Sequence, residues 1–508
     1  MSSEEKGIPV GATSSSPVLT VAGQQQGRLN ALLDEHGATW DSPDDPHDPY
    51  NWPSIRKISV ALVVSLGQLV TLMSTSMMAA ALTQIGADLH LGSTATQVTF
   101  SIFILGLAFA PFLIAALSEM YGRRPIWIAS NLFYIMWNAL CPVSSSVGLM
   151  TVGRFLAGSG ASAGITLTGP ILADMYRPEH RGRSLALATF IPYLGPALGP
   201  MIGGVISQHL PWGWLFWVLS LFDAAIVLIG ICFLPECYTP SLLRKKAALH
   251  RHLQDAANAP LSSFSKRRLT LLLDKAFYQN LSTRLGAHLI RPLGLLVCRP
   301  AIQVIALIMA LNFAIYCLLL STYATLWIER YGESATVSSL NYIAIAIGTI
   351  TASQVGGHLM DWIYQALKTR HHDATPTPEF RIPFLIPGVL LVPVGIFLYG
   401  WSAEKRLHWV VVDVGTAIFV TGSFILSQGM LAYLLDEFTT HAASANAAAR
   451  MLSNILGFVF PIFAPDLYAA LGYGWGNSLL GFIFVAVGWP IPVILWVYGS
   501  RLRAIGRS

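Results

Sequence analysis

The sequence predicts an all-α integral membrane protein whose twelve transmembrane helices form two six-helix bundles. Of its 508 residues, 54% are hydrophobic and only 11% are charged, whereas a soluble domain carries about a quarter charged residues. Apolar stretches near the ~20 residues that a helix needs to cross a bilayer core recur along almost the whole chain. The expected spans are 58–82, 96–117, 126–146, 148–172, 185–207, 213–234, 301–327, 337–360, 382–400, 409–434, 444–470 and 477–498.

The longest polar stretch after the N-terminus separates the first six spans from the last six. The expected parts are a cytoplasmic, largely disordered N-terminal tail, a first bundle, a cytoplasmic central loop, a second bundle and a short cytoplasmic tail. Their boundaries are 1–55, 56–234, 235–300, 301–500 and 501–508. The central loop begins with leucines interleaved with basic residues, which predicts an amphipathic helix on the anionic inner leaflet. A binding platform for a partner protein is the alternative.

The distribution of basic residues predicts the orientation. If the N-terminus is cytoplasmic and the loops alternate, 26 of the 31 Lys and Arg lie on the cytoplasmic side. Only Arg330, Lys405 and Arg406 lie outside, and Arg154 and Arg450 lie inside spans. This bias predicts that both termini are cytoplasmic. Since the basic residues follow the topology, the net charge of +5 gives no reason to expect a nucleic-acid partner.

No cofactor and no metal site are expected, and the chain is not expected to be an enzyme. The cysteines lack metal-ligand or disulfide spacing, and packing in apolar surroundings explains them. No cluster of His, Cys and Asp has the spacing of a metal site or of a nucleophile with its base. No lysine follows a glycine, so the sequence lacks the Gly-Lys phosphate loop of an ATPase.

The loop between the second and third spans combines Glu119, Gly122, Arg123 and Arg124. An acid and two arginines at a tight turn can clamp neighbouring helix ends through charge-assisted hydrogen bonds. The pattern resembles the signature loop of the major facilitator superfamily, in which such residues lock a cytoplasmic gate. Glu119 stands where that family usually has Asp, and Ala115 stands where it usually has Gly.

Two further acids are expected to join this cytoplasmic gate. Asp174 ends the fourth span among several basic residues. Asp361 ends the segment Gly357-His358-Leu359-Met360-Asp361, a degenerate copy of the loop at the matching junction of the second half. A repeat at equivalent places supports two related bundles.

Arg154 is a full charge within the fourth span, where insertion costs about 2.5–3.5 kcal/mol at mid-helix. It resembles the arginine motif of the family's fourth helix, which is associated with proton coupling. Structural pairing with a buried polar group is the alternative. The spans contain two acids, Asp223 and Asp413, and a second base, Arg450. Pairing is the favoured interpretation for Asp223, and in the family the eleventh helix, which carries Arg450, borders the cavity.

The fifth span contains a run of small residues and prolines, which weaken a helix and therefore need a reason. Close helix packing is one explanation. The run also resembles the Gly-Pro-x-x-Gly-Gly motif of proton-coupled antiporters. The motif residues are Gly195, Gly199, Pro200, Gly203 and Gly204. We expect this stripe to close against span 337–360 of the other bundle.

Other segments extend the resemblance from about 39 to 503, among them Asn51-Trp52-Pro53 and Leu234-Pro235-Glu236-Cys237-Tyr238. Together they are similar to the fungal twelve-helix drug:proton antiporters, which export drugs, polyamines and secondary metabolites. The resemblance implies a monomeric, proton-coupled exporter of an organic small molecule that works by alternating access in the plasma membrane. Its partners would be that substrate, protons and the lipid bilayer. A proton-independent facilitator or a nutrient or polyamine importer is the alternative function, and the vacuolar membrane is the alternative location.

Polar residues within the spans are candidates for lining a substrate cavity. For each of them an interhelical hydrogen bond is the competing explanation. No motif predicts which substrate the cavity would take. The candidates are Gln68, Tyr193, Asn312, Tyr316 and Asn454.

Overall fold

The computed structural model describes residues 39–143, 146–176, 190–258, 296–370, 378–437 and 442–505, together with a few isolated residues (30, 32–34, 286 and 293–294). The expected disorder of residues 1–55 lies mostly outside this part of the chain, as do most of the central loop and the basic segment after Asp174. Within the described residues every regular element is a helix.

The first half begins with a 3₁₀ turn, η1 (Pro49–Asn51), and the second half begins at α13. The helices of the first half are α2 (Ser54–Ser76), continued by η2 (Met77–Ala81) and α3 (Leu82–Asp88), then α4 (Ser93–Tyr121), α5 (Arg123–Leu140), α6 (Val147–Met175), α8 (Gly195–His209), α9 (Gly213–Phe233) and α10 (Thr239–Asn258). Those of the second half are α13 (Pro300–Thr325), η3 (Leu326–Arg330), α14 (Ala335–Leu340), α15 (Ile343–Arg370), η4 (Pro378–Phe384), α16 (Leu385–Glu404), α17 (Trp409–Glu437), α18 (Ala442–Gly488) and α19 (Pro490–Ala504).

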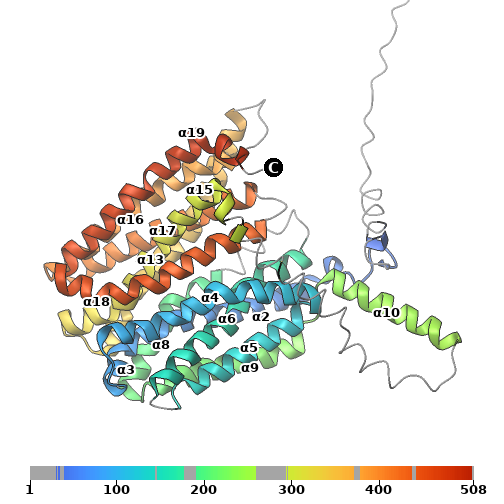
Figure 1. The fold of residues 1–508 in the computed structure, drawn as a ribbon, viewed down its shortest axis with the longest axis horizontal. Coiled ribbons are helices and arrows are strands. Elements are labelled where there is room, and N and C mark those ends of the chain that lie inside the picture. The colour runs from blue at the N-terminus through green and yellow to red at the C-terminus, as the bar shows by residue number, and fades with distance from the viewer. Residues whose placement is uncertain are drawn as a thin grey trace, which may run out of the picture.

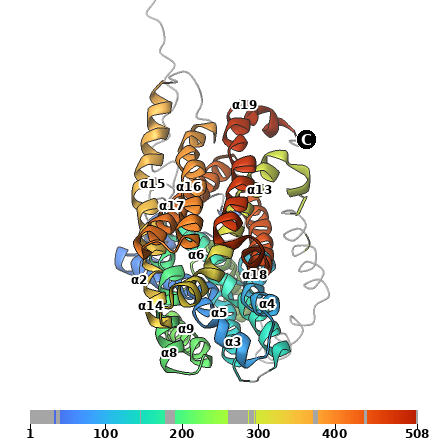
Figure 2. The ribbon, with the colours of Figure 1, turned by 90° about the vertical axis from the view of Figure 1, so that its left-hand side faces the viewer.

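The helices form two bundles that lie side by side. In Figure 1 the first bundle, α2 to α9, is blue to green, and the second, α13 to α19, is yellow to red. Figure 2 shows both from the side that carries α3, α8 and α14. The predicted all-α membrane fold with two helical halves is therefore confirmed.

Among the described residues, nine helices are long and apolar enough to cross a membrane. One of these, α18, covers two of the expected spans, because Gly472 at φ 69° interrupts the helix without ending it. The third and fifth expected spans correspond to α5 and α8, which do not meet the same criterion. The count of twelve remains a prediction.

Glycine lets helices within each bundle approach closely. A Cβ on Gly158 of α6 would collide with the carbonyl of Phe103 on α4, and one on Gly395 of α16 would collide with the backbone N of Phe419 on α17. Because lipid offers little hydrophobic drive between helices, such backbone-to-backbone packing supplies much of the attraction.

The predicted helix at the start of the central loop is present as α10. Its buried Leu243 and Ala247 pack against Trp40 from the segment before α2, and Lys246 forms an ion pair of 2.6 Å with Asp41. The N-terminal segment therefore covers part of the apolar face of α10. Contact of this helix with a membrane surface remains a prediction.

Candidate functional site

A cavity of about 180 Å³ lies between the two bundles. Both bundles contribute to its walls, which combine apolar and aromatic side chains with a few polar ones, as in many small-molecule sites. The lining residues are Leu72, Thr75, Leu107, Ile165, Tyr193 and Pro196 from the first half, and Met309, Asn312, Phe313, Tyr316, Cys317, Leu320, Ser423, Phe424, Ser427, Gln428, Leu431, Arg450, Ser453 and Asn454 from the second.

Aromatic rings form a continuous row along this cavity. Tyr193, just before α8, meets Phe424 of α17 edge to face at 5.4 Å between ring centroids. Phe424 meets Tyr316 of α13 in the same way at 6.2 Å, and Tyr316 stacks on Phe313 at 6.4 Å. The row crosses from the first bundle to the second, and its ring faces and edges suit an aromatic ligand.

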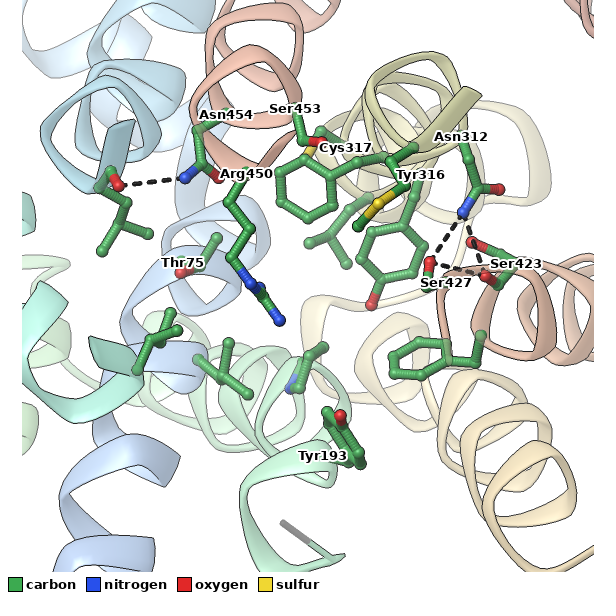
Figure 3. A pocket seen from close by; sticks show the side chains of 18 of the residues that line it. Thr75, Tyr193, Asn312, Tyr316, Cys317, Ser423, Ser427, Arg450, Ser453 and Asn454 are labelled. Atoms are coloured by element: carbon green, nitrogen blue, oxygen red, sulfur yellow. Dashed lines mark hydrogen bonds between the residues drawn. The ribbon is translucent and has the colours of Figure 1, made fainter. Parts of the chain in front are cut away.

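Asn312 holds α13 to α17 at the wall of the cavity. Its Nδ2 donates to the carbonyl of Ser423 at 3.0 Å and to Oγ of Ser427 at 3.1 Å (Figure 3). Its Oδ1 and the hydroxyl of Tyr316 are buried without a hydrogen-bond partner in the described structure.

A hydrogen bond between the bundles replaces one that a proline removes. Pro111 lies inside α4, and since proline has no N–H, the carbonyl of Leu107 one turn earlier lacks its usual helical donor. Nδ2 of Asn454 on α18 donates to that carbonyl at 3.1 Å. The amide of the second bundle thus satisfies a backbone group that the first bundle leaves open.

Arg450 of α18 is exposed to the cavity. In Figure 3 its guanidinium extends into the open space bordered by Thr75, Tyr193 and Tyr316. No carboxylate lies within 4 Å of it in the described structure.

Four of the five candidate cavity residues line this cavity: Tyr193, Asn312, Tyr316 and Asn454. Gln68 does not, because the cavity wall on α2 begins one turn further along, at Leu72. Sequence reasoning missed Ser423 and Ser427, although serines four residues apart in an apolar span share one helix face.

The predicted gate residues Arg123 and Asp174 meet at one end of the first bundle. Nε of Arg123 lies 3.1 Å from Oδ2 of Asp174, and its Nη1 donates to Oγ of Ser118 at 2.7 Å. The guanidinium also covers the ring of Tyr238 at 4.5 Å. We call Ser118, Arg123, Asp174 and Tyr238 the Arg123 cluster.

The other predicted gate residues have different surroundings. Nη2 of Arg124 donates to the carbonyl of Ile231 at 2.7 Å and so ties α5 to the end of α9. Glu119 is half-buried on the last turn of α4. Asp361 lies within α15, and its side chain is outside the described structure.

Glu236 gives the segment Leu234–Tyr238 a structural role that sequence reasoning missed. Its carboxylate accepts hydrogen bonds from the backbone N–H groups of Arg123 at 3.0 Å and Arg124 at 3.3 Å. It thereby caps the N-terminus of α5 and complements the helix dipole. Gly122 has φ 104°, and a Cβ there would collide with this carboxylate, so only glycine fits the turn.

Arg154 is buried in the first bundle and does not line the cavity. Its guanidinium donates to the carbonyls of Ser74 at 3.4 Å and Phe100 at 3.3 Å. It also lies 4.5 Å from the ring centroid of Phe103. No carboxylate in the described structure pairs with it, so carbonyl dipoles and a ring face hold this charge.

The two intramembrane acids differ. Asp413 accepts a hydrogen bond of 2.8 Å from the hydroxyl of Tyr323. Asp223 is fully buried, and neither of its oxygens has a hydrogen-bond donor among the described residues. The expected structural pairing of Asp223 is therefore wrong for this conformation, whereas Asp413 is paired.

The glycines of α8 face two different neighbours. A Cβ on Gly195 would lie 2.8 Å from Cβ of Leu72, one on Gly199 2.7 Å from Oγ of Ser76, and one on Gly203 2.8 Å from the carbonyl of Met77. All three contacts lie within the first bundle. The expected contact with the other bundle is therefore wrong for Gly199 and Gly203, because the face they share is turned toward α2 and η2.

Gly204 and its neighbours make the predicted contact between bundles. A Cβ on Gly204 would collide with Cβ of Ser339 on α14 and lie 2.6 Å from the carbonyl of Ala335. Oγ of Ser339 donates to the carbonyl of Met201 at 3.3 Å. Pro200 is buried on the same helix. This contact holds α8 against the start of the second bundle's second long helix.

We expect Gly204→Ala to loosen the contact between bundles, because the added methyl overpacks the contact with Ser339 at a cost of about 1–3 kcal/mol. Cross-linking of a Met201→Cys/Ser339→Cys pair should fall severalfold. The matched change Gly203→Ala should lower thermal stability and leave the cross-link intact. Equal cross-linking in the two variants would contradict the conclusion that Gly204 contacts the other bundle while Gly203 contacts its own.

We expect Asn454→Leu to destabilise the protein by about 1–3 kcal/mol, because the carbonyl of Leu107 loses the donor that replaces the missing N–H of Pro111. In a Pro111→Ala background the helix supplies its own N–H, and the same change should cost clearly less. Denaturant unfolding in detergent of both single variants and the double variant measures this coupling. Strictly additive effects would show that the amide does not compensate for the proline.

Comparison with known proteins supports one family. Residues 64–461 match the model of the Major Facilitator Superfamily. The chain is 38% identical over 432 residues to the probable efflux pump mfs2 of Aspergillus flavus, which covers 85% of this chain and 100% of that protein. It is 36% identical over 479 residues to the efflux pump vrtL of Penicillium aethiopicum, which covers 94% of this chain and 92% of that protein.

Among solved structures, the xylose transporter XylE of E. coli in a partially occluded inward-open conformation is similar, with a TM-score of 0.59 over 87% of this chain and 98% of that chain. At 16% identity this likeness shows the fold alone. The predicted family is confirmed by the model match and by the fungal relatives. The chain therefore belongs to the major facilitator superfamily, and to the fungal membrane transporters within it.

Proposed function

We propose that this transporter is a proton-coupled exporter of an organic small molecule and works by alternating access. The central cavity carries the proposal, since it lies between two separately packed bundles and takes its walls from both. The efflux function in the names of its relatives supports the direction of transport.

The hydrogen bonds between the bundles are of a kind that can be exchanged between conformations. The amide of Asn454 bonds to Leu107, Ser339 bonds to Met201, and the N–H of Thr336 donates to Oε1 of Gln208 at 3.0 Å. Each such bond contributes about 1 kcal/mol net. Glycine contacts to a neighbouring backbone occur at many places within each bundle, whereas between the bundles Gly204 makes such a contact with Ala335. Two rigid halves joined by weak contacts favour rocking about the cavity.

In this proposal Arg154 takes part in proton coupling. The guanidinium of Arg154 is fully buried, and its contacts in the described structure are with backbone carbonyls and an aromatic ring. Because no described carboxylate neutralises this charge, its electrostatic effect on nearby groups is strong. A proton that moves through about 100 mV gains about 2.3 kcal/mol, and each pH unit adds about 1.36 kcal/mol. Their sum supports a gradient of several hundredfold, which is sufficient for export.

The proposed location is the plasma membrane, with both termini cytoplasmic. The bias of Lys and Arg toward the loops on that side supports the orientation. In this orientation the Arg123 cluster lies at the cytoplasmic end and the contact of Gly204 with α14 lies at the outer end. The two sites would then act as gates of opposite sides, and one chain would form one complete transport unit.

We expect Arg154→Lys and Arg154→Ala to insert and fold yet lose most proton-driven transport, because neither can reproduce a planar fork with several donors. The assay follows the uncharged dye Nile red in inside-out vesicles with an imposed pH gradient, with and without a protonophore. Arg406→Gln, a charge change in a loop far from the cavity, serves as the matched control. Protonophore-insensitive transport, or full transport by both Arg154 variants, would refute the coupling role.

A further inference from the structure

We propose that the central cavity binds an organic anion, an aromatic acid whose carboxylate meets Arg450 and whose ring lies along Tyr193, Phe424 and Tyr316. This assignment of a substrate class rests on the proposed function.

The charge of the cavity is unbalanced. Of its twenty lining residues within the described structure, Arg450 alone has an ionised side chain at neutral pH. The others are apolar, aromatic, hydroxyl or amide residues. A single positive charge among apolar walls attracts an anion much more strongly than it would in water and repels a cation equally. The cavity therefore selects by charge.

Among the residues that the structure describes, none forms an ion pair or a hydrogen bond with the guanidinium of Arg450. This lack of a partner is notable because Arg450 lies on α18, within one of the candidate membrane spans. Arg154 provides the contrast, because it is fully buried and engages two backbone carbonyls and a ring. A charge is expensive within a membrane and usually marks a function when it faces a cavity. Five N–H donors in a planar fork match a carboxylate in bidentate geometry.

The opposite wall supplies the rest of an aromatic-acid site. Figure 3 shows the guanidinium of Arg450 directed toward the side of the cavity that holds Tyr193 and Tyr316. Tyr316 lines the cavity, and its ring belongs to the row that Phe424 continues. Aromatic rings beside one guanidinium that has no ion-pair partner in the described structure match a planar, singly charged aromatic anion.

The test measures binding before transport, using three probes of nearly the same shape: 2-naphthoate, the uncharged 2-naphthamide and the cationic 2-naphthylmethylamine. A ligand that binds the folded state raises the midpoint of thermal unfolding in detergent. We expect 2-naphthoate to raise it and to bind at least tenfold more tightly than either analogue. Equal stabilisation by all three probes, or preference for the amine, would overturn the proposal.

Variants at position 450 assign the effect to the guanidinium. Arg450→Gln should weaken 2-naphthoate binding at least tenfold and leave 2-naphthamide binding within twofold. Arg450→Lys should retain part of the preference, since it keeps the charge without the fork. The control Arg406→Gln should behave as the parent protein. Unchanged naphthoate binding in Arg450→Gln would overturn the proposal, as would parallel loss of both probes in a folded variant.

A second measurement covers the case in which Arg450→Gln fails to fold. In the parent protein, 2-naphthoate should compete with Nile red transport while the amine does not, and the reverse order would overturn the proposal. The binding assay needs no transport, so a protein that binds naphthoate selectively but does not export it under an imposed pH gradient would contradict the proposed exporter function alone. A protein that exports Nile red without charge selectivity would contradict the anion site alone.

Discussion

A membrane interior offers no water to backbone polar groups, and each of them must find a partner within the protein. Proline is where this requirement is hardest to meet, because it removes a donor from the helix. Pro111 leaves the carbonyl of Leu107 without its helical donor, and the amide of Asn454 in the other bundle donates to it instead. Pro393 leaves the carbonyl of Val389 open, and the indole of Trp489 donates to it at 3.0 Å. The same requirement produces the all-helical fold and fixes where its helices touch.

The polar groups of this transporter fall into two kinds. Glu236 and Arg154 are held by several backbone partners, and they stiffen the helix ends and the interior of the first bundle. Arg450 has no such partner in the part of the chain that the structure describes, and it lines the cavity. Groups of the first kind are bound by the protein itself, whereas the guanidinium of Arg450 can bind another molecule.

The sequence predicts the helical membrane fold and part of the candidate site, but it does not predict which helices the predicted faces contact. Length and hydropathy indicate most of the membrane spans, because the bilayer sets both the length and the apolar character of a spanning helix. The pairing of Arg123 with Asp174 is in line with the charges at that helix junction. The direction of a helix face does not follow from spacing alone. Gly199 and Gly203 share a face, yet only packing decides that it meets α2 and η2. Likewise Gln68 lies on α2 one turn before the residues that reach the cavity, and sequence cannot say where a cavity ends.

The bond from Asn454 to Leu107 also has a consequence for hydration. If the bundles part along α4 and α18, the carbonyl of Leu107 cannot return to a helical partner, because residue 111 remains a proline. Water must then take the place of the amide, since a bare carbonyl in an apolar surrounding is costly. Separation of α4 from α18 and hydration of the cavity are thus one event. Pro111 couples the two, so that the contact between these helices is dry while it is closed and becomes an aqueous path when it opens.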